Sequence, residues 1–292
     1  MKLVSVIIPT YNSEKFISKT IDSCLRQTHS EIEILIIDDN SLDGTKQVIK
    51  SYKDPRIKYY LHERNLGVAA SRNTGIRNAS GDFIAFLDHD DEWMPEKTAH
   101  QLEVFKNSAL EIGLVFTTGC SEYAHNLIKE KAPTGIVYNP KKDSFFPLKK
   151  SIAPPSSWML PRAVVNEIGD FDTSIYSWDD CDYSTRVSLK YPVYFLNENL
   201  VIWHILPGHL GIVSYKTIKG KEIFLNKYFD FIKKDRKYLS KFYKAIGKDA
   251  IFIDKNIARK YLFKALLMRP LDLSIIGKLA RTLGNKIPKN NY

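Results

Sequence analysis

The sequence predicts an α/β protein in which a mostly parallel, Rossmann-like sheet is flanked by helices and followed by a basic, helical C-terminal extension. Strand and helix patterns alternate through the first third of the chain, a rhythm that produces parallel sheets covered by helices. The strand patterns are apolar without polar alternation, as expected for strands buried on both faces. The chain has 292 residues, 44% hydrophobic and 26% charged, which is enough for a sizeable core and excludes a disordered or fibrous protein.

The predicted elements follow the hydrophobic pattern in chain order. The first strand covers residues 4–8 and is stopped by Pro9, and apolar side chains then recur at helical spacing. Further strands are predicted at residues 32–37, 57–61, 83–87 and 113–118, and helices at 45–52, 69–78 and 96–105. Residues 125–160 show little periodicity. Later segments predict helices at 164–168 and 180–189, strands at 193–196 and 200–203, and helices beyond residue 214.

The positive charge of the chain is concentrated at its C-terminal end. Residues 215–292 carry 20 Lys and Arg against 6 Asp and Glu, a net charge of +14, whereas residues 1–214 sum to −4. Such a tail predicts an anionic partner, either nucleic acid or a membrane surface. The tail has no recognisable nucleic-acid-binding module, so no nucleic acid is expected, and lysines beside an apolar stripe favour an anionic membrane. A tail on the membrane would take no part in the chemistry; packing of the extension on the body is the alternative.

The cysteine usage and the hydropathy pattern predict the compartment. Cys24, Cys120 and Cys181 are odd in number and far apart, which excludes a disulfide framework and a cysteine-rich zinc site. A reducing cytoplasm fits this usage best. No apolar run approaches the roughly 18 to 20 residues of a membrane span, and the N-terminus lacks a signal-peptide pattern. We therefore expect a cytoplasmic protein, bound at most peripherally to the cytoplasmic face of the membrane.

Acidic and polar residues follow three of the predicted strands. The carboxyl ends of parallel strands form the ligand-binding edge of a sheet, so these positions are candidates for chemistry. Residues 9–12 follow the first strand, Asp39 the second, and Asp88 and Asp90 the fourth. There is no glycine-rich phosphate loop, but the carboxylates of Asp88 and Asp90 suit Mn²⁺ or Mg²⁺, which can bridge a nucleotide diphosphate. Turn formation and helix capping are the alternative roles of such residues.

Four linked motifs resemble the nucleotide-binding half of family 2 glycosyltransferases. They are SVIIPTYN at residues 5–12, IDDNS at 37–41, NLGVAASRNTG at 65–75 and GDFIAFLDHDD at 81–91. The resemblance covers about the first 110 residues. It implies the GT-A fold and inverting transfer of a hexose from a nucleoside diphosphate sugar, usually a UDP-sugar. It also implies three parts: a nucleotide-sugar-binding half (1–110), a half that binds the acceptor and carries the catalytic base (111–214), and the basic helical extension (215–292).

The resemblance implies roles for individual residues of the first half. It assigns Asp39 to the base of the nucleotide, Asp90 to the metal ion, and Asp88 to the ribose or to metal-bound water. The implied donor-binding residues are Pro9, Thr10, Tyr11, Asp39, Arg72, Asp88 and Asp90, of which Asp88 and Asp90 are also the implied metal ligands.

The second half resembles the family more loosely. After Gly169–Asp172, the acidic pair Asp179 and Asp180 falls where the family has Glu-Asp, and the resemblance makes Asp180 the catalytic base. Helix capping is the alternative for both residues, because they stand where a helix can begin. Relatives carry a histidine near the metal, a place that His204 or His209 could take, although strict register gives Leu206.

The acceptor is expected to be a hydroxyl group of a glycan or of a lipid-linked sugar, in the synthesis of cell-surface polysaccharide or glycolipid. Trp158 and Trp178, with Asp179, are candidate acceptor contacts, because an aromatic ring can stack on a sugar or simply fill the core. Two alternatives to sugar transfer stay open. One is a metal-dependent nucleotidyl or phosphoryl transferase, and the other is a non-catalytic module that binds nucleotides or polyanions.

Overall fold

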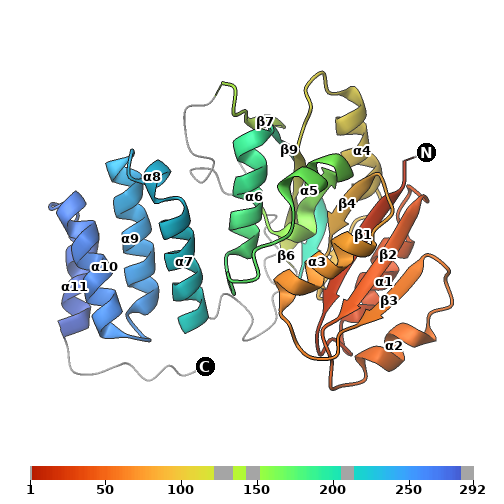
Figure 1. Cartoon of the computed structure of the whole chain (residues 1–292), viewed down its shortest axis with the longest axis horizontal. Coiled ribbons are helices and arrows are strands. Elements are labelled where there is room, and N and C mark those ends of the chain that lie inside the picture. The colour runs from red at the N-terminus through yellow and green to blue at the C-terminus, as the bar shows by residue number, and fades with distance from the viewer. Residues whose placement is uncertain (1, 122–133, 143–151, 205–213, 284–292) are drawn as a thin grey trace. The chain divides into compact units, whose positions relative to one another are not determined.

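The computed structural model describes residues 2–121, 134–142, 152–204 and 214–283. By internal contacts the chain divides into two compact units. The α/β unit comprises residues 1–173 and 180–205, and the helical unit comprises residues 174–179 and 206–292. Both the sheet and the C-terminal helices expected from the sequence are present (Figure 1).

In the described residues, nine strands form one mixed sheet of order β3-β2-β1-β4-β8-β6-β9-β5, with β7 also paired to β9. The strands are β1 (Val4–Thr10), β2 (Ile32–Asp38), β3 (Ile57–Leu61), β4 (Phe83–Phe86), β5 (Asp91–Trp93), β6 (Leu114–Ser121), β7 (Gly135–Tyr138), β8 (Trp158–Pro161) and β9 (Val193–Trp203). The pairs β1–β2, β1–β4 and β2–β3 are parallel, as the apolar strand patterns predict. Their carboxyl ends therefore lie along one edge of the sheet.

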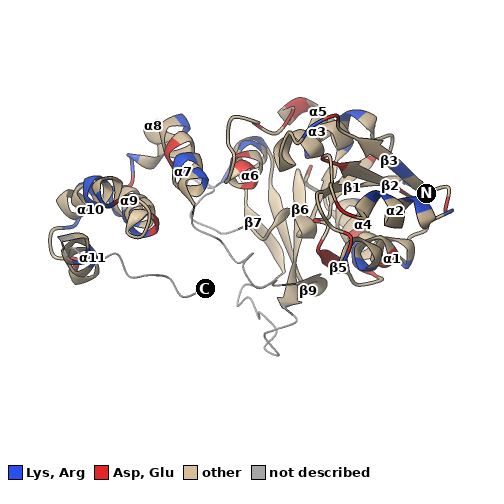
Figure 2. Cartoon of the chain, turned by 90° about the horizontal axis from the view of Figure 1, so that it is seen from below, with Lys and Arg blue, Asp and Glu red and all other residues tan. Residues whose placement is uncertain are grey.

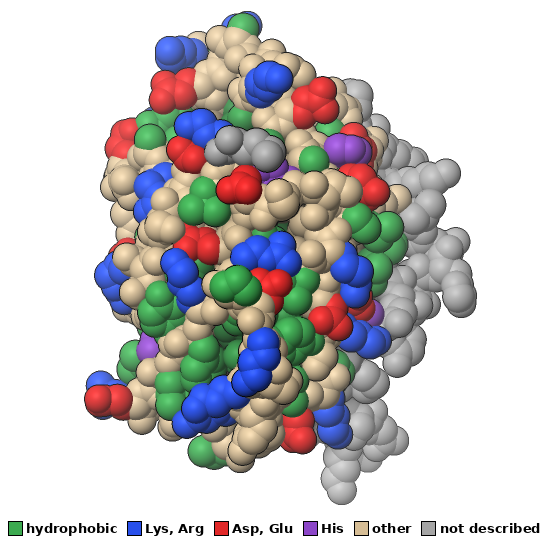
Figure 3. All heavy atoms as spheres, turned by 90° about the vertical axis from the view of Figure 1, so that its right-hand side faces the viewer, with side chains coloured by type: hydrophobic (Ala, Val, Ile, Leu, Met, Phe, Trp, Pro, Cys, Tyr) green, Lys and Arg blue, Asp and Glu red, His purple; other side chains and the backbone are tan. Residues whose placement is uncertain are grey.

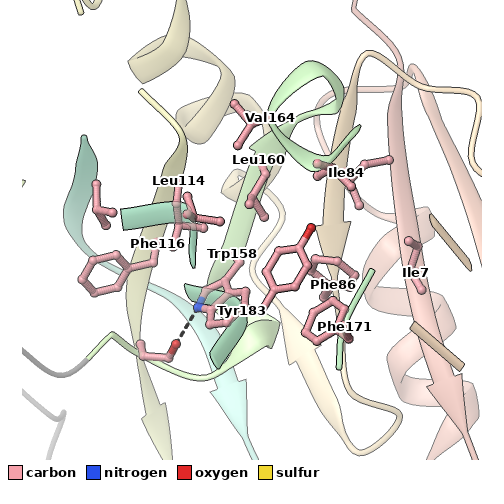
Figure 4. Packing of buried hydrophobic residues seen from close by; sticks show 14 of the residues in the cluster. Ile7, Ile84, Phe86, Leu114, Phe116, Trp158, Leu160, Val164, Phe171 and Tyr183 are labelled. Carbon is pink, nitrogen blue, oxygen red and sulfur yellow. Dashed lines mark hydrogen bonds between the residues drawn. The ribbon is translucent and has the colours of Figure 1, made fainter. Parts of the chain in front are cut away.

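Helices cover both faces of this sheet. The helices of the α/β unit are α1 (Ile17–Leu25), α2 (Thr45–Ser51), α3 (Val68–Asn78), α4 (Lys97–Asn107), α5 (Arg162–Ile168) and α6 (Asp179–Lys190), whose first residue belongs to the helical unit. Side chains of α1, α2 and α4 pack on one face with Val4, Val6 and Ile8. Side chains of α3, α5 and α6 pack on the opposite face, around Phe86 and Trp158 (Figure 4). Successive side chains of β1 enter opposite clusters, with Ile7 on one face and Val6 and Ile8 on the other. The strand therefore needs apolar residues at successive positions.

Three strands were missed by the sequence analysis, and one was split. β5, β7 and β8 have three or four residues each, and they depend on pairing with β9, β4 or β6 rather than on a periodic pattern. Residues 193–203 form the single strand β9, although Asn197 and Glu198 interrupt its apolar pattern. The parallel β6–β9 pairing shifts register near Thr117 and Thr118, so the ladder continues past the polar residues.

The helical unit contains α7 (Tyr215–Lys227), α8 (Phe229–Ile232), α9 (Arg236–Ala250), α10 (Lys255–Met268) and α11 (Leu273–Leu283). Side-chain caps define where three of these helices begin. Ser214 forms a capping box with Thr217, Asp235 accepts from the third residue of α9, and Asp254 caps α10. The apolar side chains Ala258, Leu262 and Ala265 of α10 are fully buried. The apolar stripe predicted for this segment is thus confirmed as packing surface.

The two units differ in the charge that they present. Acidic and basic side chains are interspersed on the face of the α/β unit seen in Figure 3. Lys and Arg outnumber Asp and Glu along α7 to α11, as the blue and red ribbon segments of Figure 2 show. Within the described residues, no helix combines the length and the apolar composition needed to cross a bilayer.

One buried carboxylate ties together the amino ends of β1, β2 and β4. Glu33 is 4% exposed, accepts hydrogen bonds from Ser5, Ser80 and Gly81, and forms a 2.6 Å ion pair with Lys58. Burial opposes ionisation of Glu33, but the hydrogen bonds from Lys58, Ser5 and Ser80 outweigh it and lower its pKa to about 2. The ionised form therefore stabilises the fold.

We expect Glu33→Gln to reduce the free energy of unfolding by about 1 to 3 kcal/mol at pH 7, because a charged acceptor is lost from a buried network. Because the folded pKa lies below the unfolded value of about 4.3, this contribution is complete above pH 5 and disappears as the pH falls toward 2. Urea unfolding at pH 7, 5 and 3 measures it. Asp230→Asn is the control and should leave the stability nearly unchanged, since the Asp230 side chain is 83% exposed. A constant difference from pH 7 to 3 would contradict the linkage.

Candidate active site

The carboxyl ends of β1 and β2 are joined into one edge. Thr10 is opposite Asp38 in the parallel register, and the backbone N–H of Asp39 donates to the Thr10 carbonyl at 2.8 Å. Beyond the strands, the backbone N–H of Asn12 donates to the Ser41 hydroxyl at 2.9 Å. Among the described residues, the non-glycine residues with positive φ are Asn12, Asn40 and Trp178; asparagine is the side chain that tolerates this conformation best. The two loops are therefore sharply turned and held to each other.

The predicted donor-binding residues of the first loop differ in accessibility. Pro9 and Thr10 are buried within the end of β1, whereas Tyr11 is 40% exposed. Of this segment, the Tyr11 ring is the part most open to a ligand.

The carboxylate of Asp39 is buried and held by hydrogen bonds. It is 4% exposed and accepts hydrogen bonds from the backbone N–H groups of Leu66 at 2.8 Å and Gly67 at 2.7 Å. Nδ1 of His62 lies 2.8 Å from Oδ1 of Asp39, and Nε2 lies 3.0 Å from the Thr74 hydroxyl. Sequence reasoning missed His62, although it directly follows β3 at the same edge of the sheet. Its position between Asp39 and α3 fixes the orientation of the carboxylate.

Asp88 faces a buried cation. A guanidinium nitrogen of Arg72 donates to Asp88 Oδ1 at 2.9 Å, and Arg72 is only 4% exposed. The same guanidinium lies 5.4 Å from the centroid of the Phe171 ring. The structure thus brings together the predicted site residues Arg72 and Asp88, which are 16 positions apart.

Ser156, which sequence reasoning also missed, holds the loop from Asp88 to Asp91 through hydrogen bonds. The Ser156 hydroxyl accepts from the Asp88 N–H at 3.1 Å and donates to Asp91 Oδ2 at 2.5 Å. The Ser156 carbonyl accepts from the Trp93 indole at 2.7 Å. Burial and the charges of Asp88 and Asp90 together raise the pKa of Asp91 to about 8, against the hydrogen bond from Ser156, which lowers it. Asp90 is half-buried, in a loop rich in carboxylates.

The donor set at this edge fits a hard divalent cation. Asp88 and Asp90 offer carboxylate oxygens, which Mg²⁺ and Mn²⁺ prefer, in a loop held in place by Ser156. In the part of the chain that the structure describes, no three His, Cys, Asp or Glu side chains converge as a complete metal site. Mg²⁺ usually takes only one or two carboxylates from a protein and completes its coordination with phosphates and water.

Of the two histidines predicted as possible metal ligands, the structure describes His204. The antiparallel β5–β9 ladder places Trp203 opposite Asp91, so His204 follows directly beside the acidic loop. Nε2 of His204 lies 2.8 Å from Glu92 Oε1, and the histidine is thus engaged by a neighbouring carboxylate. His209 lies outside the described residues.

Helix α6 begins with the acidic pair predicted to carry the base. Asp179 is 5% exposed, whereas Asp180 is half-buried and its Oδ1 accepts from the Cys181 N–H at 2.8 Å. Asp182 is fully buried and forms a 2.9 Å ion pair with Arg186. Of the three carboxylates, Asp180 is the most accessible to a second reactant.

Both tryptophans predicted as acceptor contacts pack against other side chains. Trp158 is 1% exposed, and its indole donates to the Ala153 carbonyl at 2.6 Å (Figure 4). Trp178 lies against Phe224 and Phe242, with ring centroids 5.5 Å apart in each pair. These positions fit the core-filling alternative that the sequence left open.

The chain is similar to known proteins in sequence. The family model described as glycosyl transferase family 2 matches residues 5–169. The uncharacterized glycosyltransferase RP339 of Rickettsia prowazekii is 29% identical over 285 residues, covering 94% of this chain and 86% of that protein. The UDP-Glc:alpha-D-GlcNAc-diphosphoundecaprenol beta-1,3-glucosyltransferase WfgD of Escherichia coli is 41% identical over 140 residues, covering 47% of this chain and 54% of that protein.

The chain is also similar in fold to solved structures. S. aureus TarS 1-349 in complex with UDP-GlcNAc matches with a TM-score of 0.66 and 18% identity, covering 96% of this chain and 89% of that one. The mannosyltransferase PcManGT from Pyrobaculum calidifontis, in complex with GDP-Man and Mn²⁺, matches with a TM-score of 0.60 and 16% identity, covering 97% and 86%. These similarities confirm the expected GT-A fold.

We expect Ser156→Ala to lower the free energy of unfolding by about 2 kcal/mol or more, because it removes the hydroxyl that accepts from the Asp88 N–H and donates to the buried Asp91 carboxyl. Ser157→Ala is the matched control. Ser157 is equally buried, but its hydroxyl donates only to the Pro154 carbonyl, and its loss should cost about 1 kcal/mol. Urea denaturation of both variants checks the difference. Equal losses would mean that Ser156 does not hold the acidic loop.

Proposed function

The chain belongs to glycosyl transferase family 2 and is a glycosyltransferase, and we propose that it transfers a sugar from a UDP-sugar, with inversion, to a hydroxyl group of a glycan or lipid-linked acceptor. The observation that carries the proposal is the grouping of Asp39, Asp88 and Asp90 in loops that leave β2 and β4, on either side of β1. Family membership favours this reaction over nucleotidyl or phosphoryl transfer and over a non-catalytic binding module. The UDP donor is supported by WfgD, which is named for UDP-Glc, and by the TarS complex with UDP-GlcNAc.

In this proposal Asp39 recognises the uracil base. Among the described residues, three donors reach its carboxylate, and a carboxylate has about four acceptor positions. We assign the fourth position to the N–H of the base. Because His62 and the start of α3 hold the carboxylate, it does not have to reorganise on binding. Thr10 and Tyr11 border the same place from β1.

Asp88 and Asp90 would hold the Mn²⁺ or Mg²⁺ ion against the diphosphate. The PcManGT complex with GDP-Man and Mn²⁺ supports the use of a divalent metal by proteins of this fold. The ion supplies positive charge that offsets the charge of the departing diphosphate. Arg72 orients the Asp88 carboxylate through their 2.9 Å ion pair.

Asp180 would accept the proton of the acceptor hydroxyl as that oxygen attacks the anomeric carbon. A carboxylate oxygen within reach of the hydroxyl can act as a general base. A single base with a single displacement inverts the anomeric configuration. The buried Asp182, bound to Arg186, is less suited to this step.

The acceptor would be lipid-linked and the enzyme would work at an anionic membrane surface on the cytoplasmic side. WfgD is named for a diphosphoundecaprenol acceptor. The helical unit combines excess positive charge with exposed apolar side chains on and between α10 and α11. These are Phe263 (55% exposed), Leu267 (53%), Leu271 (91%), Leu273 (80%) and Ile276 (42%). Apolar side chains beside lysines suit the interface of a bilayer.

We expect Asp90→Ala to weaken Mn²⁺-dependent binding of UDP at least tenfold while changing the binding of uridine little, because the metal touches phosphate and not the base. Asp82→Ala is the control. Asp82 lies at the amino end of β4, at the end of the strand opposite to Asp90, and pairs with Lys2 at the surface. Isothermal titration with UDP and uridine, with Mn²⁺ or with excess chelator, measures both affinities. Chelation should also abolish release of UDP from a UDP-sugar. Full activity in excess chelator would contradict the metal assignment.

We expect the protein to sediment with phosphatidylglycerol vesicles at low salt and to be released at high salt, since each basic residue near an anionic surface contributes about 1 kcal/mol that salt screens. The double change Leu271→Ser and Leu273→Ser should weaken sedimentation, because it removes two exposed apolar side chains. Leu110→Ser is the control, an exposed leucine of the α/β unit. Protein that stays in the supernatant at low salt would contradict the membrane proposal.

A further inference from the structure

Trp178 has a backbone conformation that large side chains rarely adopt. Its φ is 76°, in the left-handed region where the Cβ of an L-residue crowds its own backbone. Such a conformation persists where the surroundings force it, and it is concentrated at functional sites. Trp178 stands two positions before Asp180.

The contacts that hold the Trp178 ring all belong to the helical unit. The ring packs edge to face against Phe224 of α7 and Phe242 of α9, with interplanar angles of 69° and 77°. The ammonium group of Lys221 lies 5.0 Å from the ring centroid and pairs with Asp249 of α9. Two helices and one internal ion pair therefore fix the side chain.

The backbone beside Trp178 is held as closely as its ring. A Cβ atom added at Gly220 of α7 would lie 1.9 Å from the Ser177 carbonyl oxygen, so only glycine fits this contact. Ile175 is 1% exposed and Asp179 is 5% exposed. By their contacts residues 174–179 belong to the helical unit, although they lie far from its helices in sequence.

We propose that Trp178, held by α7 and α9, is a positioning residue that fixes the backbone immediately before Asp180 and thereby how this carboxylate is directed. The inference rests on the proposed function, in which Asp180 is the base. A single residue separates Trp178 from Asp180, so a displacement of the anchored segment passes along the chain to the carboxylate. A displacement of about 1 Å at a reacting group can reduce the rate about a hundredfold. This proposal gives α7 and α9 a part in the chemistry and differs from the sequence-based expectation, in which the tail takes none.

A matched pair of glycine substitutions tests the inference. Gly220→Ala forces the Ser177 carbonyl away from α7, whereas Gly277→Ala, in α11, meets no atom within 4 Å. The assay is Mn²⁺-dependent release of UDP from whichever UDP-sugar most raises the melting temperature of the wild type. We expect Gly220→Ala to lower kcat at least tenfold with KM for the donor within twofold of wild type. Gly277→Ala should change neither value.

A second set of variants separates positioning from loss of stability. Trp178→Ala should lower kcat as Gly220→Ala does, and Trp178→Phe should restore most of it by keeping a ring between Phe224 and Phe242. Leu262→Ala is the control, because Leu262 is fully buried and packs on Gly247 of α9, outside the anchored segment. It should lower the melting temperature without lowering kcat, when all variants are assayed below their melting temperatures.

Asp180→Asn in the same assay distinguishes this inference from the proposed function. A loss of turnover in Asp180→Asn together with wild-type kcat in Trp178→Ala and Gly220→Ala overturns the inference and leaves Asp180 as the base. Wild-type turnover in Asp180→Asn overturns both. A loss of kcat in Leu262→Ala as large as in Trp178→Ala means that general stability, and not the anchor, controls the rate, which also overturns the inference.

Discussion

The parallel pairing of β1 with β2 and β4 is the constraint on which the candidate site depends. It brings the ends of three strands to one edge, and backbone hydrogen bonds extend the ladders past the strands themselves. The Asp39 N–H donates to Thr10, and the Leu87 N–H donates to Ile7 at 3.0 Å, one residue before Asp88. The acidic loops are thus continuations of the sheet. A slip of one residue in either pairing would invert the side chains of a strand and turn the carboxylates away from that edge.

Each held carboxylate at this edge receives its partners from a segment distant in sequence. The carboxylate of Asp39 is bound by residues after β3, and that of Asp88 by Arg72 of α3. Ser156, just before β8, accepts from the backbone N–H of Asp88. Removal of one member of a buried ion pair leaves a charge without compensation, which costs far more than an exposed pair gains. The site therefore cannot form before the segments that carry these partners have folded, and its acidic groups are oriented before any ligand binds.

The sequence predicts the features that depend on local pattern. The apolar runs define β1 to β4, and the polar residues that follow them lie at one edge because parallel topology requires it. His62 could have been found by the same rule, since it follows β3 directly. Ser156 could not, because its place beneath Asp88 depends on the insertion of β8 between β4 and β6. Strands of three or four residues carry no periodic signal, and their pairing is decided by partners far along the chain.

The left-handed conformation of Trp178 could not be predicted from the sequence, because it depends on a balance of energies. A left-handed conformation costs a residue with a Cβ about 1 to 2 kcal/mol. Its two edge-to-face ring pairs contribute about 0.5 to 1.5 kcal/mol each, and the nearby ammonium adds about 0.5 to 1 kcal/mol. One ring pair contributes an amount comparable to that cost, so its loss can allow the backbone to relax to negative φ. No local pattern encodes this balance, because Phe224 and Phe242 follow Trp178 by 46 and 64 positions. Because the contacts of Trp178 offset the cost of its conformation, the backbone before Asp180 depends on the intact packing of α7 and α9.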